Sequence, residues 1–320
     1  MNHSCSIIIP IYNEENNIRA CFNTISKQKY RKLEIVFIDD GSTDGSASII
    51  NKIIMENINM NIKYIFQENN GAASARLVGI HHASSNFIAF LDCDDWLDED
   101  SILSAMEEFT DPDIDFSLFN LLYTSREKNK ITPFTYFTKE KKIAGSIAFK
   151  NSINNWGLHG FGIIRKEILL QSYNDYFCIN RKRTNYLNND EIITRLCFLN
   201  SKYISLSRGN YFFFNNILST TKRINNNYCK VVYNSIILDK FITYNLNYNY
   251  SYRENSIDLV ARTAWGIFIR YLKWKTNIDK DIWIKALDES TKYYHQANGC
   301  KKIKQVIKMK IIRLYTFINC

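Results

Sequence analysis

Phe87-Ile88-Ala89-Phe90-Leu91-Asp92-Cys93-Asp94-Asp95 decides the fold, because a short apolar run typical of a buried strand ends at once in acidic residues. Three other segments of the first 120 residues also pass from an apolar run into polar, loop-forming residues. They are Ser6–Pro10 before Tyr12-Asn13, Leu33–Ile38 before Asp39-Asp40-Gly41-Ser42, and Ile62–Phe66 before Glu68-Asn69-Asn70-Gly71. In an open parallel sheet, the carboxyl ends of such strands meet at one edge, where ligands bind.

Helical patterns separate these four runs, which predicts βα units and an α/β fold with a mostly parallel sheet. Asn13, with Glu14 and Glu15, is expected to cap the first helix. A third helix is expected over Ala72–His82. The inward positions expected on the first two helices are Ile18, Cys21, Phe22 and Ile25, then Ala47, Ile50 and Ile54.

Beyond the first 120 residues the pattern is less regular. Residues 124–158 are polar and aromatic, as expected of a loop region. From about residue 216 the apolar spacing is helical, so we expect an α/β domain over 1–215 and a helical region over 216–320. The remaining elements predicted are strands at Asp115–Leu122, Gly160–Arg165 and Tyr203–Leu206, and a helix at Asp190–Leu199.

Composition excludes several classes of protein. The 320 residues are 46% apolar and 14% aromatic, enough for a full core. Six of the basic residues behind the net charge of +9 lie in the last 21 positions, so a general nucleic-acid-binding surface is not supported. The sequence has no apolar run of about 20 residues and no basic leader before Ile7, which predicts a cytoplasmic protein. The eight cysteines form no C-x-x-C pair and are expected to be reduced.

Asp92, Asp94 and Asp95 follow one strand so closely that their carboxylates are expected to crowd together. Such a cluster is costly unless a cation neutralises it, and hard oxygen ligands suit Mg²⁺ or Mn²⁺. The alternative is an acidic turn in which Asp98 and Glu99 cap the next helix. Spacing alone leaves both interpretations open.

The ends of the first two strands offer groups that suit a nucleobase. A carboxylate after the second strand could accept a hydrogen bond from the N–H of a pyrimidine, while Tyr12 could stack on the face of the ring. Asp-Gly-Ser is also a common turn sequence. The sequence lacks Gly-x-Gly-x-x-Gly after the first strand and lacks Gly-x-x-x-x-Gly-Lys, which excludes Rossmann-type dinucleotide binding and P-loop chemistry.

Four motifs within residues 6–98 resemble family 2 glycosyltransferases of the GT-A fold, in order and in spacing. They are Ser6–Glu14, Ile38–Ser46, Asn69–Arg76 and Phe90–Asp95. The resemblance implies that residues 1–120 bind a nucleotide sugar and that residues 121–215 form the acceptor side.

The same resemblance implies roles for individual residues. Arg76 would lie near the nucleotide, and Asp92 would contact the ribose or the sugar. Asp94 would bind the divalent ion that bridges the diphosphate, and Asp95 would face the donor sugar. The residues implied at the uracil base are Pro10, Tyr12 and Asp40, and the other donor-site positions expected from these motifs are Glu14, Asp39 and Cys93.

A base that takes the proton of the acceptor hydroxyl is expected at Asn189-Asp190-Glu191. In inverting members of the family this helix start usually reads Glu-Asp with the Asp as base, which implies Asp190. Asn189 stands where that Glu is common, so Glu191 remains a rival. The alternative without catalysis is an acidic first turn favoured by the helix macrodipole.

Two further groups of residues receive no individual roles. A downstream aromatic segment with a Ser-Thr pair resembles one that closes the donor site in many relatives. Another group falls where acceptor or leaving-group contacts often arise, although core packing is the alternative for its Trp and its His. The first comprises Tyr211–Asn216 with Ser219 and Thr220, and the second comprises Trp156, His159 and Arg165.

The C-terminal segment predicts a basic amphipathic helix. Two interpretations are open: the helix lies on the inner membrane surface, or it packs on the catalytic domain with its basic face in water. Its apolar positions are Ile303, Ile307, Ile311, Leu314 and Ile318, and its basic ones are Lys301, Lys304, Lys308 and Arg313.

The resemblance therefore implies an inverting glycosyltransferase that moves a hexose or N-acetylhexosamine from a UDP-sugar to a glycan hydroxyl. The expected acceptor is polyprenyl-diphosphate-linked, as in O-antigen or capsule assembly, with the enzyme in the cytoplasm or peripheral on the membrane. One alternative is a sugar-phosphate nucleotidyltransferase, but Ile11–Glu15 lacks the glycine- and arginine-rich loop that such enzymes carry. The other is an inactive nucleotide-sugar-binding or scaffold protein.

Overall fold

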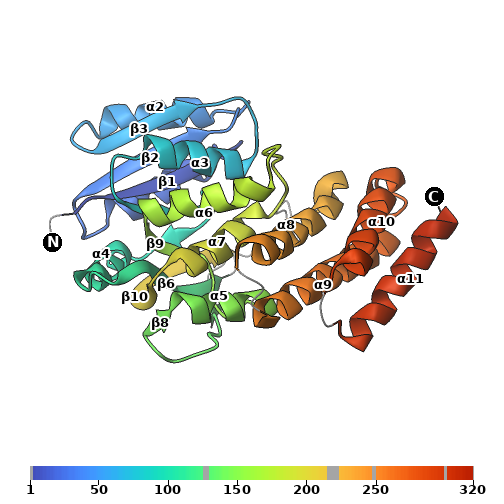
Figure 1. Cartoon of the computed structure of the whole chain (residues 1–320). Coiled ribbons are helices and arrows are strands. Elements are labelled where there is room, and N and C mark those ends of the chain that lie inside the picture. Colours follow the sequence, from blue (N-terminus) through green and yellow to red (C-terminus); the bar gives the residue numbers. More distant parts are fainter. Residues whose placement is uncertain (1–2, 125–129, 215–222, 247–249, 299–300, 320) are drawn as a thin grey trace. The chain divides into compact units, whose positions relative to one another are not determined.

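The structure is a computed structural model of the chain, and it describes residues 3–124, 130–214, 223–246, 250–298 and 301–319 (Figure 1). The chain divides into two compact units, which are treated in turn. The first unit comprises Met1–Phe149, Gly157–Ser172 and Cys197–Asn215. The second comprises Lys150–Trp156, Tyr173–Leu196 and Asn216–Cys320.

The described part of the first unit is built on a ten-stranded sheet, in which eight strands run in the order β3-β2-β1-β4-β9-β6-β10-β5 while β7 pairs with β6 and β8 with β10. The strands are β1 (Cys5–Ile11), β2 (Leu33–Asp39), β3 (Asn61–Phe66), β4 (Phe87–Phe90), β5 (Trp96–Leu97), β6 (Ile114–Thr124), β7 (Ile131–Pro133), β8 (Lys142–Ala144), β9 (Gly162–Arg165) and β10 (Tyr203–Phe214). The four predicted N-terminal strands are present, each within one residue of its predicted bounds.

The central ladders of this sheet are mostly parallel. β1 pairs in parallel with β2 and β4, β2 with β3, and β6 with β10. β9 is inserted antiparallel between β4 and β6. The predicted α/β class with a mostly parallel sheet is therefore confirmed, and the ends of β1, β2, β3 and β4 do lie at one edge.

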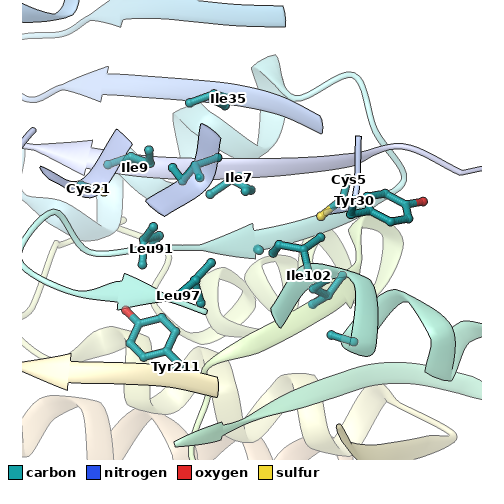
Figure 2. Close-up of a cluster of buried hydrophobic side chains, with 14 of the residues drawn as sticks. Cys5, Ile7, Ile9, Cys21, Tyr30, Ile35, Leu91, Leu97, Ile102 and Tyr211 are labelled. Atoms are coloured by element: carbon teal, nitrogen blue, oxygen red, sulfur yellow. The ribbon is translucent and has the colours of Figure 1, made fainter. Parts of the chain in front are cut away.

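The helices between the first strands cover both faces of the sheet. They are α1 (Ile18–Ser26), α2 (Ser46–Glu56) and α3 (Ala72–His82). Successive side chains of a strand point to opposite faces. Ile7 and Ile9 of β1 join one core cluster with residues of α1 and α2, together with Leu91, Leu97 and Tyr211, as Figure 2 shows. Ile8 faces the other way, where Gly79 of α3 lets the helix approach closely.

One local prediction about these helices was wrong. Asn13 does not cap the first helix, because α1 begins five residues later at Ile18. Asn13 instead takes a left-handed conformation with φ of 56°. On α2, Ile50 is buried and Ile54 is partly buried against the same core, as predicted, and Ile53 is buried as well.

The region from 124 to 158 is more regular than predicted. Its described residues contain β7, β8 and the helix α5 (Gly145–Asn154). α5 begins at Gly145, where an added Cβ would lie 1.9 Å from the Ser201 carbonyl oxygen. The backbone at the start of this helix therefore packs closely against Ser201, which the weak apolar pattern did not indicate. No helix was predicted at α6 (Lys166–Ile179), and α4 (Ser101–Glu107) was expected only as the helix next to Asp98 and Glu99. A short 3-10 helix, Glu108–Thr110, follows α4.

The second unit is helical, which confirms the predicted helical C-terminal region. Its core surrounds the fully buried Trp283 and includes Tyr271 and Tyr294. None of the helices in the described ranges is long and apolar enough to cross a membrane. Cys300 and Cys320 lie outside the described residues. The elements here are α7 (Asn189–Asn200), a 3-10 turn (Asn226–Lys230), α8 (Val231–Asn245), α9 (Tyr250–Trp274), α10 (Lys280–Gln296) and α11 (Ile303–Asn319).

Candidate active site

The loop after β1 is held against the loop after β2. The Asn13 backbone N–H donates to the Ser42 hydroxyl at 3.0 Å, and the Asn13 side-chain oxygen accepts from the Thr43 N–H at 2.8 Å. The left-handed backbone of Asn13 permits both bonds, and Asn tolerates that conformation better than most residues. Beside it, Pro10 is partly exposed and the Tyr12 ring is 50% exposed, so both can meet a flat ligand at this edge.

The two carboxylates at the end of β2 are both buried, Asp39 at 1% and Asp40 at 3% exposed, but they bind different partners. One oxygen of Asp39 accepts from the Ser42 N–H and the other from the Tyr64 hydroxyl, each at 2.8 Å. The Asp39 carboxylate thus holds the loop after β2, and its expected contact with a donor stays a prediction.

Asp40 fastens the loop between β3 and α3. Its Oδ1 accepts from the Gln67 amide at 2.6 Å and from the Asn70 N–H at 2.8 Å, while Oδ2 accepts from the Gly71 N–H at 2.7 Å. A carboxylate offers about four acceptor positions. Three are used here, so one position is left for an N–H of a bound base.

Arg76 of α3 meets Asp92, which follows β4. The Arg76 Nη2 lies 2.7 Å from Oδ1 of Asp92, and their side chains are 16% and 32% exposed. The interpretation of Arg76 as a helix-surface charge is therefore wrong. The pair brings two predicted donor-site residues together at the carboxyl edge.

Asp95 is buried in the protein instead of facing the donor sugar. Its side chain is 3% exposed, its Oδ2 accepts from the Tyr211 hydroxyl and its Oδ1 from the Phe214 N–H, both at 2.7 Å. Tyr211 lies more than a hundred residues later, on β10, and no local pattern marked it. We therefore correct the expected role of Asp95: it ties the acidic motif to β10.

Cys93 also faces inward. It is 5% exposed and belongs to the core cluster that includes Cys21 of α1. Burial and the Cys21 thiol raise the pKa of Cys93, so the thiol stays protonated. The expectation that Cys93 binds substrate is corrected, since the alternation along the chain turns it away from the edge.

Negative charge accumulates around the acidic motif. Burial raises the pKa of Glu14, and the nearby Asp94 and Asp92 raise it as well. Burial also raises the pKa of Asp95, and Asp92 is the next contributor. Asp92 and Asp94 thus disfavour the ionised forms of Glu14 and Asp95, so a cation at this edge would be stabilised.

The three carboxylates are crowded, as predicted, since Asp92 and Asp94 both raise the pKa of Asp95, but their side chains turn in different directions. Asp92 turns to Arg76, Asp95 turns to Tyr211, and Asp94 is partly exposed. In the ranges that the structure covers, no group of three or more His, Cys, Asp or Glu side chains could hold an ion by itself. Mg²⁺ is usually bound by one or two carboxylates together with substrate phosphates. The residues present fit that arrangement, with Asp94 as the protein ligand.

The two predicted bases lie in the first turn of α7, in the second unit. They differ in exposure and in the contacts of their carboxylates. Asp190 is exposed. Glu191 is anchored: its carboxylate accepts from the Trp156 indole and the Asn188 amide, both at 3.3 Å, and lies 3.5 Å from the buried Arg195. Burial raises the pKa of Glu191, partly offset by Arg195.

Three other side chains considered from sequence pack within the protein. His159 is buried against Tyr136, 2.9 Å from its hydroxyl, and burial lowers its pKa to about 3. Arg165 is bound to Asp115 at 3.2 Å. Trp156 contacts Glu191 and stacks beneath the Arg195 guanidinium. The packing interpretation fits His159, which is 6% exposed, whereas Trp156 is 37% exposed. Asn215, Asn216, Ser219 and Thr220 lie outside the described residues.

The sheet is mostly parallel, and polar residues gather at its carboxyl edge, among them Tyr12, Asp40, Arg76 and Asp92. This arrangement defines a glycosyltransferase domain of the GT-A fold. The chain belongs to glycosyl transferase family 2, whose family model matches residues 6–172.

Individual relatives agree with this assignment. Glycosyltransferase GlyG of Streptococcus pneumoniae is 26% identical over 225 residues, covering 67% of this chain and 71% of GlyG. The minor teichoic acid biosynthesis protein GgaA of Bacillus subtilis is 35% identical over 131 residues, covering 38% of this chain and 29% of GgaA. The chain spans between 16% and 71% of the length of the curated relatives that it matches.

A solved structure supports the fold over nearly the whole chain. Residues 1–349 of TarS from S. aureus, in complex with UDP-GlcNAc, align with a TM-score of 0.67 over 99% of this chain and 92% of that one. The sequence identity is 18%, so the likeness concerns the fold.

Proposed function

We propose that the protein is an inverting glycosyltransferase that transfers a hexose or N-acetylhexosamine from a UDP-sugar to a hydroxyl of a glycan. One observation carries the proposal: Tyr12, Asp40 and Asp92 follow three separate strands at one sheet edge, and Arg76 of α3 pairs with Asp92 there. The complex of TarS with UDP-GlcNAc supports a uridine nucleotide as donor.

Each group at this edge has a task that its chemistry suits. The Tyr12 ring stacks on uracil, and the remaining acceptor position of Asp40 takes the N–H of the base. Arg76, held by Asp92, supplies positive charge toward the diphosphate. Pro10 and Glu14 border this region.

We assign the ion ligand to Asp94. A divalent ion, Mn²⁺ or Mg²⁺, held by Asp94 and the diphosphate would offset the charge that develops on the departing nucleotide. The crowding of carboxylates that raises the pKa of Glu14 supports a cation at this edge.

The transfer step is a single displacement. The Asp190 carboxylate accepts the proton of the acceptor hydroxyl, and the hydroxyl oxygen forms a bond to the anomeric carbon from the face opposite the nucleotide. The bond from that carbon to the phosphate oxygen breaks, and UDP leaves with the electron pair. Because Glu191 is anchored by Trp156 and Asn188, the exposed Asp190 is the better placed proton acceptor.

The acceptor that we propose is a lipid-linked cell-surface glycan carried on polyprenyl diphosphate, as in O-antigen or capsule assembly. The similarity to GgaA, a teichoic acid biosynthesis protein, supports a surface polymer. A site on the cytoplasmic face of the membrane accords with such an acceptor.

The donor is identified by assaying UDP-, GDP- and dTDP-sugars with and without Mn²⁺, against lipid-linked acceptors. We expect turnover with a UDP-sugar and loss of turnover with chelator. NMR of the product should show inversion at the anomeric carbon. Retention of configuration, or preference for GDP-sugars, would contradict the proposal.

The base is tested with Asp190→Asn, and the matched control is Asp281→Asn, which removes an acidic first-turn residue from α10. Asp190→Asn should abolish transfer while UDP binding persists, whereas Asp281→Asn should leave transfer unchanged. This contrast separates catalysis from a helix-dipole effect and also tests the alternative of an inactive binding protein. Full transfer by Asp190→Asn would shift the assignment to Glu191.

A further inference from the structure

Helix α11 has apolar side chains on two opposite faces. One face is packed: Met309 and Ile312 are fully buried in the core of the second unit. The other, which we name the exposed apolar stripe, consists of large side chains that are between 45% and 83% exposed. Its members are Ile303, Ile307, Ile311, Leu314, Phe317 and Ile318.

This arrangement favours one of the two interpretations of the C-terminal sequence. The interpretation without a membrane required the stripe to be the packing face of the helix. Within the second unit, α11 packs through the face of Met309 and Ile312 instead. Contiguous exposed apolar surface of this kind normally marks a site of interaction.

Basic residues border the stripe on both sides. Successive residues of an α-helix are rotated by about 100°. This rotation places Lys304 along one edge of the stripe and Arg313 along the other. Lys310 lies within the stripe, between Ile303 and Phe317, and Lys308 lies farther round the helix, with its ammonium 5.2 Å from the centre of the Trp265 ring. Long basic side chains at such edges extend their charges toward phosphate groups while their stems cover apolar surface. The last 21 residues contain no acidic side chain that would neutralise them.

Positive charge is also concentrated where α10 ends and α11 begins. Burial lowers the pKa of His295, and Arg313, Lys301 and Lys310 lower it further. Burial and the Arg253 guanidinium lower the pKa of Lys301. These cations repel one another, so an extended anionic surface would relieve the repulsion, whereas a second copy of the chain would bring like charges together.

We propose that the exposed apolar stripe and its basic borders form a docking surface for an anionic phospholipid bilayer. The helix would lie parallel to the membrane, with the stripe at the boundary between headgroups and acyl chains. The basic borders would contact lipid phosphates. This surface shares no residue with the donor site, so docking does not depend on the proposed transfer reaction.

The test uses flotation of the full chain with vesicles of phosphatidylcholine alone or of phosphatidylcholine with phosphatidylglycerol. Wild type should float with the anionic vesicles, and less at high salt. Ile307→Ser with Leu314→Ser should weaken binding about tenfold or more. Lys304→Gln with Arg313→Gln should weaken it about tenfold.

The matched control is Met55→Ser with Ile58→Ser, which removes apolar side chains that are 76% and 83% exposed in the first unit. This control should bind anionic vesicles like wild type. Equal binding of both vesicle types, or binding that survives both α11 variants, would overturn the proposal. A wild-type dimer that dissociates in Ile307→Ser with Leu314→Ser would assign the stripe to a second copy and overturn it too. Asp94→Asn should still float, which separates this result from a failure of the proposed function.

Discussion

The Tyr211 hydroxyl donates a 2.7 Å hydrogen bond to Oδ2 of Asp95 and thereby joins β10 to the acidic motif that follows β4. The same hydroxyl lies 3.4 Å from the Asp92 N–H, which donates to it. Both side chains are buried, so the bond is shielded from water. The position of Asp94 between Asp92 and Asp95 therefore depends on a residue far away in the sequence.

Tyr211→Phe removes this hydroxyl and leaves a buried oxygen of Asp95 without its donor. We expect a loss of about 1–3 kcal/mol in the free energy of unfolding, measured with urea. The control is Tyr12→Phe, at a ring that is half exposed, where the change should be within about 0.5 kcal/mol. Equal stability of the two variants would show that Tyr211 does not anchor Asp95.

Gly41→Ala should disturb the turn that presents Asp40. Gly41 has φ of +77°, and a Cβ there would lie 2.9 Å from the Asn69 nitrogen. The left-handed backbone alone costs about 1–2 kcal/mol for alanine. Urea unfolding and UDP titration should both show weakening. Gly266→Ala is the control, because the helix leaves open space there, and its stability should rise by about 0.5–1 kcal/mol. A similar rise in Gly41→Ala would show that the left-handed backbone of Gly41 does not require glycine.

Arg76→Gln should weaken binding of UDP more than it weakens the fold. The variant removes the charge that we propose serves the diphosphate, a loss of about 1.5–3 kcal/mol, or roughly tenfold or more in Kd. Calorimetric titration with UDP measures it. Arg19→Gln is the control, because Arg19 forms an equally short pair with Glu56, at 2.7 Å, on the open surface. If both variants bind UDP like wild type, Arg76 does not serve the nucleotide.

Glu14 should make stability depend on pH. Its pKa in the folded protein is raised by burial and by Asp94 and Asp92, so the folded state holds the proton more tightly than the unfolded chain. Stability should therefore fall as the pH rises from the ordinary pKa of Glu through the raised one. Glu14→Gln keeps an acceptor for Asn17 but cannot ionise. The variant should be more stable than wild type near about pH 8 and equal to it near about pH 3; a gap that persists in acid would refute this.

Glu191→Gln should behave differently from Asp190→Asn. Arg195 is 3% exposed and has Glu191 as its ionic partner, so neutralising Glu191 leaves a buried cation less well compensated. We expect lower thermal stability with kcat largely retained. Asp190→Asn should show the opposite pattern, since Asp190 is exposed. A stable but inactive Glu191→Gln would reverse the two roles.

The sequence was most informative where consecutive residues determine the structure. Ala72–His82 was predicted with its observed bounds, because Gly71 and the apolar spacing mark both limits. It could not distinguish Asp39 from Asp40, since the difference lies in distant partners, Tyr64 for one and Asn70 for the other. The burial of Asp95 was likewise hidden, because Tyr211 reaches it only after the chain has folded back.

The Asp40 carboxylate already binds the backbone of Asn70 and Gly71. A substitution of Asp40 would therefore change the shape of the β3–α3 loop together with the choice of nucleobase. A redesign for another nucleotide that replaced Asp40 would release the segment that leads to Arg76. Engineering of donor preference would better begin at Gln67, whose side chain reaches the same carboxylate without carrying the backbone of the loop.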